Sequence, residues 1–194
     1  MTSDSPAFIR AFIAVEIDEE TRRALAKTQG MLRLAGAHVA WVAPENIHVS
    51  MVFLGDTVAD TIPRIIGEID AAAAITTPFT FEVVALGTFG RIDAPRVIWA
   101  GVRSPEAIQA LQGSIADGMR SLQIPLEARK FVPHLTLGRV KSLRGCRELA
   151  DVIRSERETC FGRVFASRVV LMRSVLKPAG AEYSVLHEAK LAAT

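Results

Sequence analysis

The stretch "IHVSMVFLG", residues 47–55, places two polar side chains, His48 and Ser50, in an otherwise apolar run. Side chains alternate between the two faces of a β-strand. We therefore predict a strand on which His48 and Ser50 share one face with Val52. The opposite, apolar face consists of Val49, Met51 and Phe53. One face is suited to a hydrophobic core, whereas the other presents a polar pair.

The sequence repeats this pattern at "HLTLGRV", residues 134–140. Here His134 and Thr136 share a face, and the leucines between and after them point the other way. The two motifs lie in similar strand and helix surroundings, and no linker rich in Pro, Gly or Ser separates them. We therefore predict one bilobal domain over residues 1–194, with pseudo-twofold symmetry. The two polar faces would meet across a central cleft.

The remaining elements favour an α+β fold. Alternation of apolar and polar residues, or short apolar runs, predict five further strands, at residues 8–17, 79–86, 96–102, 167–176 and 183–191. Helices are expected from Glu19, over Ile62–Ile69, from Ser104-Pro105-Glu106 and around Leu149–Ile153. Residues 87–95, "GTFGRIDAP", are rich in turn formers and predict a loop. Adjacent strand pairs without an intervening helix favour antiparallel or mixed sheets that face a central cleft with helices outside.

Size and composition are those of an ordinary globular protein. The chain has 194 residues, of which 49% are hydrophobic and 23% charged. It has no apolar run of membrane-spanning length and no signal-peptide pattern, so we expect a cytoplasmic protein that does not enter a membrane. Its two cysteines, Cys146 and Cys160, have no spacing typical of a disulfide framework or a zinc site.

Charge is distributed unevenly along the chain. The first 97 residues contain 8 Lys and Arg against 12 Asp and Glu, whereas the remainder contains 15 against 9. Six basic residues and no acidic residue fall between residues 128 and 147: Arg129, Lys130, Arg139, Lys141, Arg144 and Arg147. This basic block surrounds the second motif. It is either an ordinary solvent-exposed surface or a surface that binds phosphates.

Two histidines and two hydroxyls on facing strands are suited to phosphoester cleavage. Imidazole titrates near neutrality, so His48 and His134 can serve as acid and base in one turnover. Hydroxyl groups can donate hydrogen bonds to phosphate oxygens, and Arg139 at the strand end can brace the phosphate. Neither histidine has a third ligand at metal spacing, so we expect no metal and no cofactor. No nucleophile elbow of the serine hydrolases is present.

At these residues the chain resembles a family, the two-histidine (2H) phosphoesterases, and in particular the RNA 2′,3′-cyclic phosphodiesterases long called 2′-5′ RNA ligases. The resemblance covers nearly the whole chain and is carried by four segments in the family's order: "RAFIAVEI", "WVAPENIHVSMVFLG", "PRVIWAGV" and "FVPHLTLGRV". Ser50 departs from the threonine that is more frequent in the family, but it keeps the hydroxyl. The implied fold is the bilobal α+β fold already predicted.

The resemblance also implies roles for single residues. His48 resembles the proton donor to the departing 3′-oxygen, and His134 resembles the acceptor that activates water. Ser50 and Thr136 would hold the phosphate beside Arg139. Strand parity places Phe12 on the face of the site, where it is either a ring that stacks on a base or an ordinary core aromatic.

The sequence thus predicts a metal-independent enzyme that opens RNA or nucleoside 2′,3′-cyclic phosphates to 2′-phosphates, with reversible 2′-5′ joining as a possible second activity. RNA ends are the expected partner, and we expect a monomer. Two alternatives stay open. One is a 2H phosphoesterase for another substrate, such as ADP-ribose 1″,2″-cyclic phosphate or a 2′-5′ oligonucleotide. The other is a non-catalytic RNA-binding module.

Overall fold

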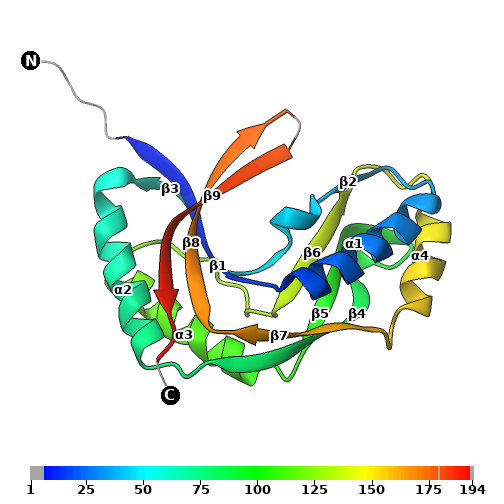
Figure 1. Ribbon diagram of the computed structural model, residues 1–194. Helices are drawn as coiled ribbons and strands as arrows, with labels where there is room; N and C mark the ends of the chain where they lie inside the picture. The colour runs from blue at the N-terminus through cyan, green and yellow to red at the C-terminus, as the bar shows by residue number, and fades with distance from the viewer. Residues whose placement is uncertain (1–6, 179, 193–194) are drawn as a thin grey trace, which may run out of the picture.

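The computed structural model describes residues 7–178 and 180–192, which form the strands and helices shown in Figure 1. The strands are β1 (Phe8–Glu16), β2 (Val39–Trp41), β3 (His48–Val58), β4 (Phe79–Arg91), β5 (Ala94–Arg103), β6 (His134–Val140), β7 (Cys160–Ala166), β8 (Arg168–Lys177) and β9 (Gly180–Lys190). The helices are α1 (Glu19–Leu34), α2 (Ile62–Ala74), α3 (Glu106–Ser121) and α4 (Cys146–Ser155), and a 3₁₀ turn, η1 (Pro44–Asn46), precedes β3.

The strands form two halves of one curled antiparallel sheet. The order is β7-β4-β5-β6-β3-β1-β8-β9, and the short β2 also pairs with β6. The two halves meet where β3 lies beside β6, through the register pair Val49 and Leu135. Each half thus contributes one motif strand to this seam. The predicted α+β class is confirmed. The two predicted sheets, however, form one continuous sheet, because β3 pairs with β6 at the seam, so the two motifs lie side by side instead of facing each other across a cleft.

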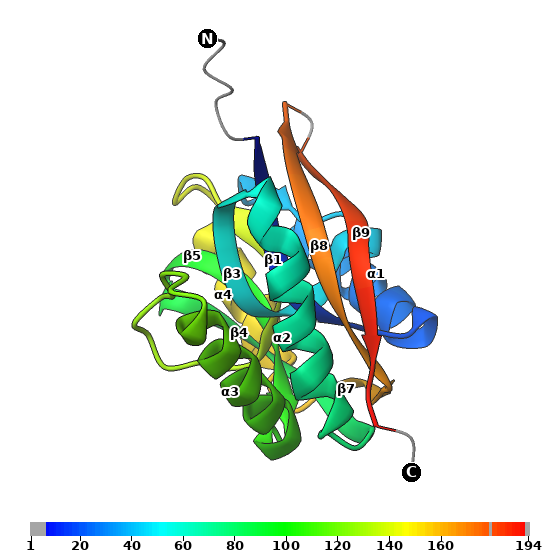
Figure 2. The same ribbon diagram turned by 90° about the vertical axis from the view of Figure 1, so that its left-hand side faces the viewer.

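The helices cover one face of the sheet. Figure 2 shows α2 and α3 side by side over the half that contains β3, β8 and β9, and Figure 1 shows α1 beside α4 over the other half. The main hydrophobic core lies between these helices and the sheet. A smaller cluster of Phe12, Ala14 and Val170 lies on the opposite side of the sheet and contains only strand residues. We call this side the helix-free face.

A β-bulge in β3 changes the predicted alternation. Ala14 pairs with Ser50, and Ile13 pairs with Val52, so Met51 is an extra residue on β3. After the bulge, Val52 packs into the main core at 6% exposure. Phe53 pairs with Phe12 on the helix-free face. The prediction for this half of the strand was therefore wrong, because simple alternation does not allow for a bulge.

The loop predicted for residues 87–95 is also wrong, since β4 and β5 continue through most of it and only Ile92 and Asp93 form the turn. The glycines that suggested a loop serve the strands. A Cβ atom on Gly87 would lie 2.2 Å from the Trp99 ring, and Gly90 has a left-handed φ of +94° at an irregularity in the pairing. The glycines thus make room for an indole and a bulge.

The predicted helices are all present, although one begins differently. Asp18 caps α1 as expected, because its carboxylate accepts a hydrogen bond from the Thr21 amide at 2.8 Å. In α3 the N-cap is Pro105, and no side chain caps the helix. The short β2 and the edge strand β7 were not predicted, because neither has a clear period-two pattern.

Candidate active site

The two histidine motifs lie side by side at the seam of the sheet. His48 opens β3 and His134 opens β6. Because Val49 pairs with Leu135 in antiparallel register, His48 lies across from Thr136, and Ser50 lies across from His134. All four side chains are half-buried on the helix-free face. The structure therefore brings together the four residues that the sequence singled out in two distant segments.

Both imidazoles are oriented by the same local contact. The Nδ1 atom of His48 lies 2.8 Å from the carbonyl oxygen of Asn46, and the Nδ1 atom of His134 lies 2.8 Å from that of Val132. A carbonyl only accepts, so each Nδ1 carries the proton and donates it. In the neutral rings Nε2 is then unprotonated. The Ser50 hydroxyl donates to Nε2 of His48 at 2.9 Å.

His48 stands in an aromatic surrounding that favours its neutral form. Its ring stacks on Phe12, with centroids 4.9 Å apart, and meets the edge of Tyr183 at 5.5 Å. Burial lowers the pKa of His48 to about 4, although the hydrogen bond to Asn46 and the negative charge of Glu16 act in the opposite direction. The His48 imidazole is therefore uncharged at neutral pH in the free protein.

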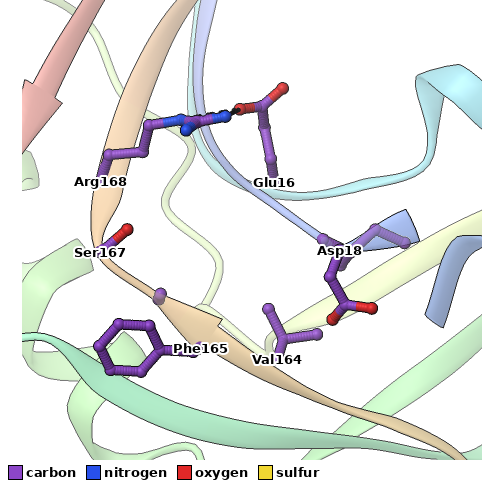
Figure 3. A pocket seen from close by; sticks show the side chains of 8 residues that line it. Glu16, Asp18, Val164, Phe165, Ser167 and Arg168 are labelled. Carbon is purple, nitrogen blue, oxygen red and sulfur yellow. Dashed lines mark hydrogen bonds and ion pairs between the residues drawn. The ribbon is translucent and has the colours of Figure 1, made fainter. Parts of the chain in front are cut away.

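Glu16 is a residue of this site that the sequence analysis missed. Glu16 on β1 lies opposite His48 on β3 in the strand register. Arg168 at the start of β8 donates a hydrogen bond to the Glu16 carboxylate at 2.7 Å. Figure 3 shows this ion pair at the rim of a cavity of about 180 Å³, which is also lined by Asp18 and by residues 164–167. Neither histidine lines this cavity. The sequence could have indicated Glu16, because it lies an even number of residues from Phe12 in "RAFIAVEI" and therefore shares its strand face.

A second aromatic group surrounds His134. The ring of Phe89 meets His134 edge to face, with centroids 4.8 Å apart and an interplanar angle of 89°. Trp99 packs against Phe89 and lies across from Thr136. Each histidine therefore contacts different aromatic side chains. These residues come from segment 87–99, part of which was predicted to be a loop, so the sequence analysis missed them.

Arg139 reaches the helix-free face through a second bulge. Trp99 pairs with Thr136 and Ile98 with Gly138, so Leu137 is the extra residue, and Arg139 pairs with Val97 on the same side as Thr136. The positive charge of Arg139 also acts on Tyr183, whose pKa is raised on balance by burial. Without the bulge, alternation would place Arg139 on the opposite side.

The basic block as a whole is exposed, and within the described residues it takes part in no ion pair. The positive charges near the second motif are therefore not neutralised by neighbouring carboxylates. An anionic polymer could meet them directly.

Phe12 does not present a ring to a ligand in this structure. It is only 1% exposed, and it is covered by His48, Phe53 and Tyr183. The prediction that its ring is available to a base is therefore not supported. Phe12 instead supports the imidazole of His48 from beneath.

Two features of residues 7–178 and 180–192 bear on metal binding and on membrane insertion. Within these ranges no three His, Cys, Asp or Glu side chains come close enough together to hold a metal ion. In the same ranges, no helix combines the length and the apolar character that a membrane crossing requires.

The curled antiparallel sheet with its helices, together with one His-x-Ser/Thr motif in each half, places the chain in the class of two-histidine phosphoesterases. Within that class, the chain belongs to the 2′-5′ RNA ligase superfamily, whose family model matches residues 17–175.

The relatives agree in sequence and in structure. An RNA 2′,3′-cyclic phosphodiesterase of Methanothermobacter thermautotrophicus is 36% identical over 176 residues, which cover 91% of this chain and 95% of that protein. One of Methanocaldococcus jannaschii is 30% identical, with coverages of 93% and 99%. A crystal structure from Thermus thermophilus superposes with a TM-score of 0.77 at 28% identity, covering 94% and 98% of the two chains. Apo LigT of Escherichia coli, at 22% identity and a TM-score of 0.76, shares the fold over 97% and 100%.

Proposed function

We propose that this protein hydrolyses RNA and nucleoside 2′,3′-cyclic phosphates to 2′-phosphates, with His48 and His134 as its acid–base pair. One observation carries the proposal: the two imidazoles lie on adjacent strands, each held through Nδ1 by a backbone carbonyl. This contact leaves both Nε2 atoms for proton transfer. The relatives named RNA 2′,3′-cyclic phosphodiesterase support the choice of substrate.

The proposed reaction transfers one proton at each side of the phosphorus. One histidine takes a proton from water as its oxygen attacks, and a new P–O bond forms. The bond between phosphorus and the 3′-oxygen breaks, and the other histidine donates its proton to that oxygen. Ser50, Thr136 and Arg139 stabilise the charge on the non-bridging oxygens. The two histidines exchange protonation states, and solvent restores them.

Ser50 has to change partner during this cycle. In the free protein its hydroxyl donates to Nε2 of His48. A phosphate oxygen can accept the same proton once the substrate is bound, which releases Nε2 for its role in proton transfer. Ser50 therefore links phosphate binding to the activation of His48.

The proposal also assigns which histidine donates a proton and which accepts one. His48 is assigned as the donor to the 3′-oxygen, and His134 as the acceptor. Because the pKa of His48 is about 4 in the free protein, this order requires His48 to gain a proton as the anionic phosphate binds beside it. The reverse order, in which a neutral His48 accepts the proton of water, is the second candidate, and the lowered pKa favours it.

A sulfur substrate distinguishes the two orders. In a cyclic phosphorothiolate with sulfur in place of the 3′-oxygen, the leaving thiolate needs little protonation because thiols have a pKa of about 8.5. If His48 is the donor, the His48→Ala variant should recover most of its activity on this substrate, whereas His134→Ala should not. Recovery by His134→Ala alone would reverse the assignment.

The class of substrate is tested by product analysis. The purified protein is incubated with 2′,3′-cyclic nucleotides, with short RNAs that end in a cyclic phosphate, and with ADP-ribose 1″,2″-cyclic phosphate. We expect 2′-phosphates from the first two, and 2′-5′ joined products where a 5′-hydroxyl RNA is present. Turnover of ADP-ribose cyclic phosphate alone would indicate a different 2H enzyme. RNA binding without turnover would indicate a binding module.

A further inference from the structure

Asn46 contacts two separate parts of the molecule. Its main-chain carbonyl accepts the hydrogen bond from Nδ1 of His48 at 2.8 Å, and its side-chain amide donates to the carbonyl oxygen of Ala181 at 3.0 Å. Ala181 lies on β9, 135 residues further along the chain. Asn46 is also the only asparagine in the sequence. It therefore joins the turn that orients His48 to a distant hairpin, formed by β8 and β9.

The outer part of this hairpin leaves the sheet. The strand β8 pairs with β1 from Val170 to Arg173, and beyond Arg173 the described residues of the hairpin form strand pairs only with each other. Figure 1 shows the two strands diverging from β1 there. Leu176, the strand partner of Ala181, is 69% exposed. The hydrogen bond from Asn46 thus anchors a part of the hairpin that the sheet does not hold.

A second contact brings the same hairpin to the imidazole itself. Tyr183 on β9 meets the His48 ring at an interplanar angle of 73°, with centroids 5.5 Å apart, and it also packs on Phe12. Ser50 contacts Nε2 of His48 in the free protein, but the proposed cycle releases this contact when the phosphate binds. The contacts with Asn46, Phe12 and Tyr183 then remain. Two of these three depend on where the hairpin lies.

The second histidine motif has no such anchor. The carbonyl that orients His134 belongs to Val132, which precedes its histidine by two residues, as Asn46 precedes His48. The Val132 side chain is 56% exposed and has no hydrogen-bond donor. The side chain at this position is therefore an anchor in one motif only, on the side of the site that the hairpin contacts.

We infer that Asn46 is a positioning residue for the proposed reaction: through its side chain, the β8–β9 hairpin keeps the His48 imidazole aligned for proton transfer. The role in the reaction rests on the proposed function, whereas the alignment is a property of the free protein. A variant without the amide still has the carbonyl of residue 46, but the turn and the hairpin are no longer joined. The ring can then rotate, and a misplaced Nε2 transfers a proton more slowly.

Kinetics on 2′,3′-cyclic AMP test the role in the reaction. Asn46→Ala should lower kcat about 10- to 100-fold, because a misplacement of about 1 Å can cost about 10²-fold in rate. KM should change less than about threefold, since the groups that bind the phosphate are unchanged. Asn46→Gln, which keeps an amide donor, should retain more of the wild-type kcat than Asn46→Ala. Glu45→Ala is the control and should change neither constant, because Glu45 is the exposed neighbour in the same 3₁₀ turn.

NMR of the imidazole nitrogens tests the alignment without any turnover. At neutral pH the His48 ring of the wild type should carry its proton on Nδ1 alone, because the Asn46 carbonyl accepts it. In Asn46→Ala we expect a second population with the proton on Nε2, and a weaker nuclear Overhauser effect between the rings of His48 and Tyr183. His134 should keep its tautomer in both proteins. This signal separates a loss of alignment at His48 from a general loosening of the fold.

The two measurements separate this role from the proposed function. If the wild type is active and Asn46→Ala keeps its kcat and its tautomer, Asn46 is not a positioning residue and the proposed function stands. A change in only one of these two readouts also contradicts the role. If the tautomer changes while the wild type hydrolyses no cyclic phosphate, the anchor stands and the proposed function fails. If Asn46→Ala does not fold, Asn46→Asp, which keeps the shape but as a carboxylate cannot donate, decides by the same readouts.

Discussion

At the scale of single residues, the charge state of His48 is set by a balance between burial and one carboxylate. Burial against Phe12 and Tyr183 removes water from the imidazole, and this effect exceeds the favourable charge of Glu16. Arg168 binds the same carboxylate at 2.7 Å. An imidazole with so low a pKa is sensitive to each of these neighbours.

Removal of the Glu16 charge should shift the pKa of His48 further down. In the Glu16→Gln variant we expect an NMR titration of the His48 ring protons to show a pKa below the wild-type value of about 4, because the carboxylate raises it. Glu188→Gln is the matched control, since Glu188 also binds Arg168 but is not among the groups that act on His48. An unchanged pKa in Glu16→Gln would show that the carboxylate does not act on the imidazole.

The same lowered pKa predicts a loss of stability in acid. The unfolded chain takes up a proton on His48 near pH 6.5, whereas the folded chain resists it until about pH 4. Stability should therefore fall as the pH decreases from 6.5 to 4, by roughly 3 kcal/mol at most for this group. Chemical unfolding across this window should show a smaller loss for His48→Asn than for the wild type. Parallel curves would contradict the assigned pKa.

At the scale of elements, bulges decide which side chains reach the site. The strand β3 has an extra residue at Met51, and β6 has one at Leu137. The first places Phe53, and the second places Arg139, on the helix-free face. Simple alternation places the residues before each bulge correctly, which is why the shared face of His48 with Ser50 and of His134 with Thr136 could be predicted from sequence.

The residues beyond the bulges could not be assigned in this way. An extra residue leaves no clear trace in a pattern of apolar and polar positions, so Val52 and Phe53 were assigned to the wrong faces. The loop predicted for residues 87–95 failed for a related reason. Glycines are typical of turns, but they also occur in strands where a large side chain, here the Trp99 indole, packs directly on the backbone. The fold class depended only on the order of the elements, and it was therefore predicted correctly.

Gly138 tests how tightly the second bulge is packed. A Cβ atom there would lie 2.6 Å from a methyl group of Val39 and 3.0 Å from the Trp41 ring. We expect Gly138→Ala to destabilise the protein by about 1 to 3 kcal/mol in chemical unfolding. Gly113→Ala is the control on α3, where a Cβ atom meets nothing within 4 Å. This change should stabilise the helix by about 0.5 to 1 kcal/mol. Equal stability of both variants would contradict the described packing.

Arg139 should affect RNA more than a mononucleotide. It is exposed, it shares a face with Thr136 and it forms no ion pair with the described residues. Because longer RNA offers more phosphates, Arg139→Ala should weaken RNA binding severalfold at low salt. The slope of the logarithm of the binding constant against the logarithm of the salt concentration should become smaller by about one. Arg64→Ala on α2 is the control, since Arg64 is exposed on the helix side. Equal effects on RNA and mononucleotide at all salt concentrations would make the basic block a solvated surface.

At the scale of the whole molecule, the curled sheet places two sequence motifs from different halves at one seam. Neither half contains both motif histidines, because β3 supplies one and β6 supplies the other. In the proposed mechanism, proton transfer and hydrogen bonds alone stabilise the transition state. We therefore expect turnover of 2′,3′-cyclic nucleotides to survive exhaustive treatment with EDTA. Loss of activity on chelation, with recovery on adding a divalent metal, would contradict this expectation.

The most direct test of the account is the turnover of a 2′,3′-cyclic nucleotide by the wild type, by His48→Ala, by His134→Ala and by the double variant. General acid–base assistance is worth about 10²- to 10⁴-fold per group, so each single variant should lose at least 10²-fold in kcat. The double variant should lose less than the product of the two single losses, because each proton transfer depends on the other. Near-wild-type turnover by either single variant would remove that histidine from the mechanism and contradict the two-histidine account.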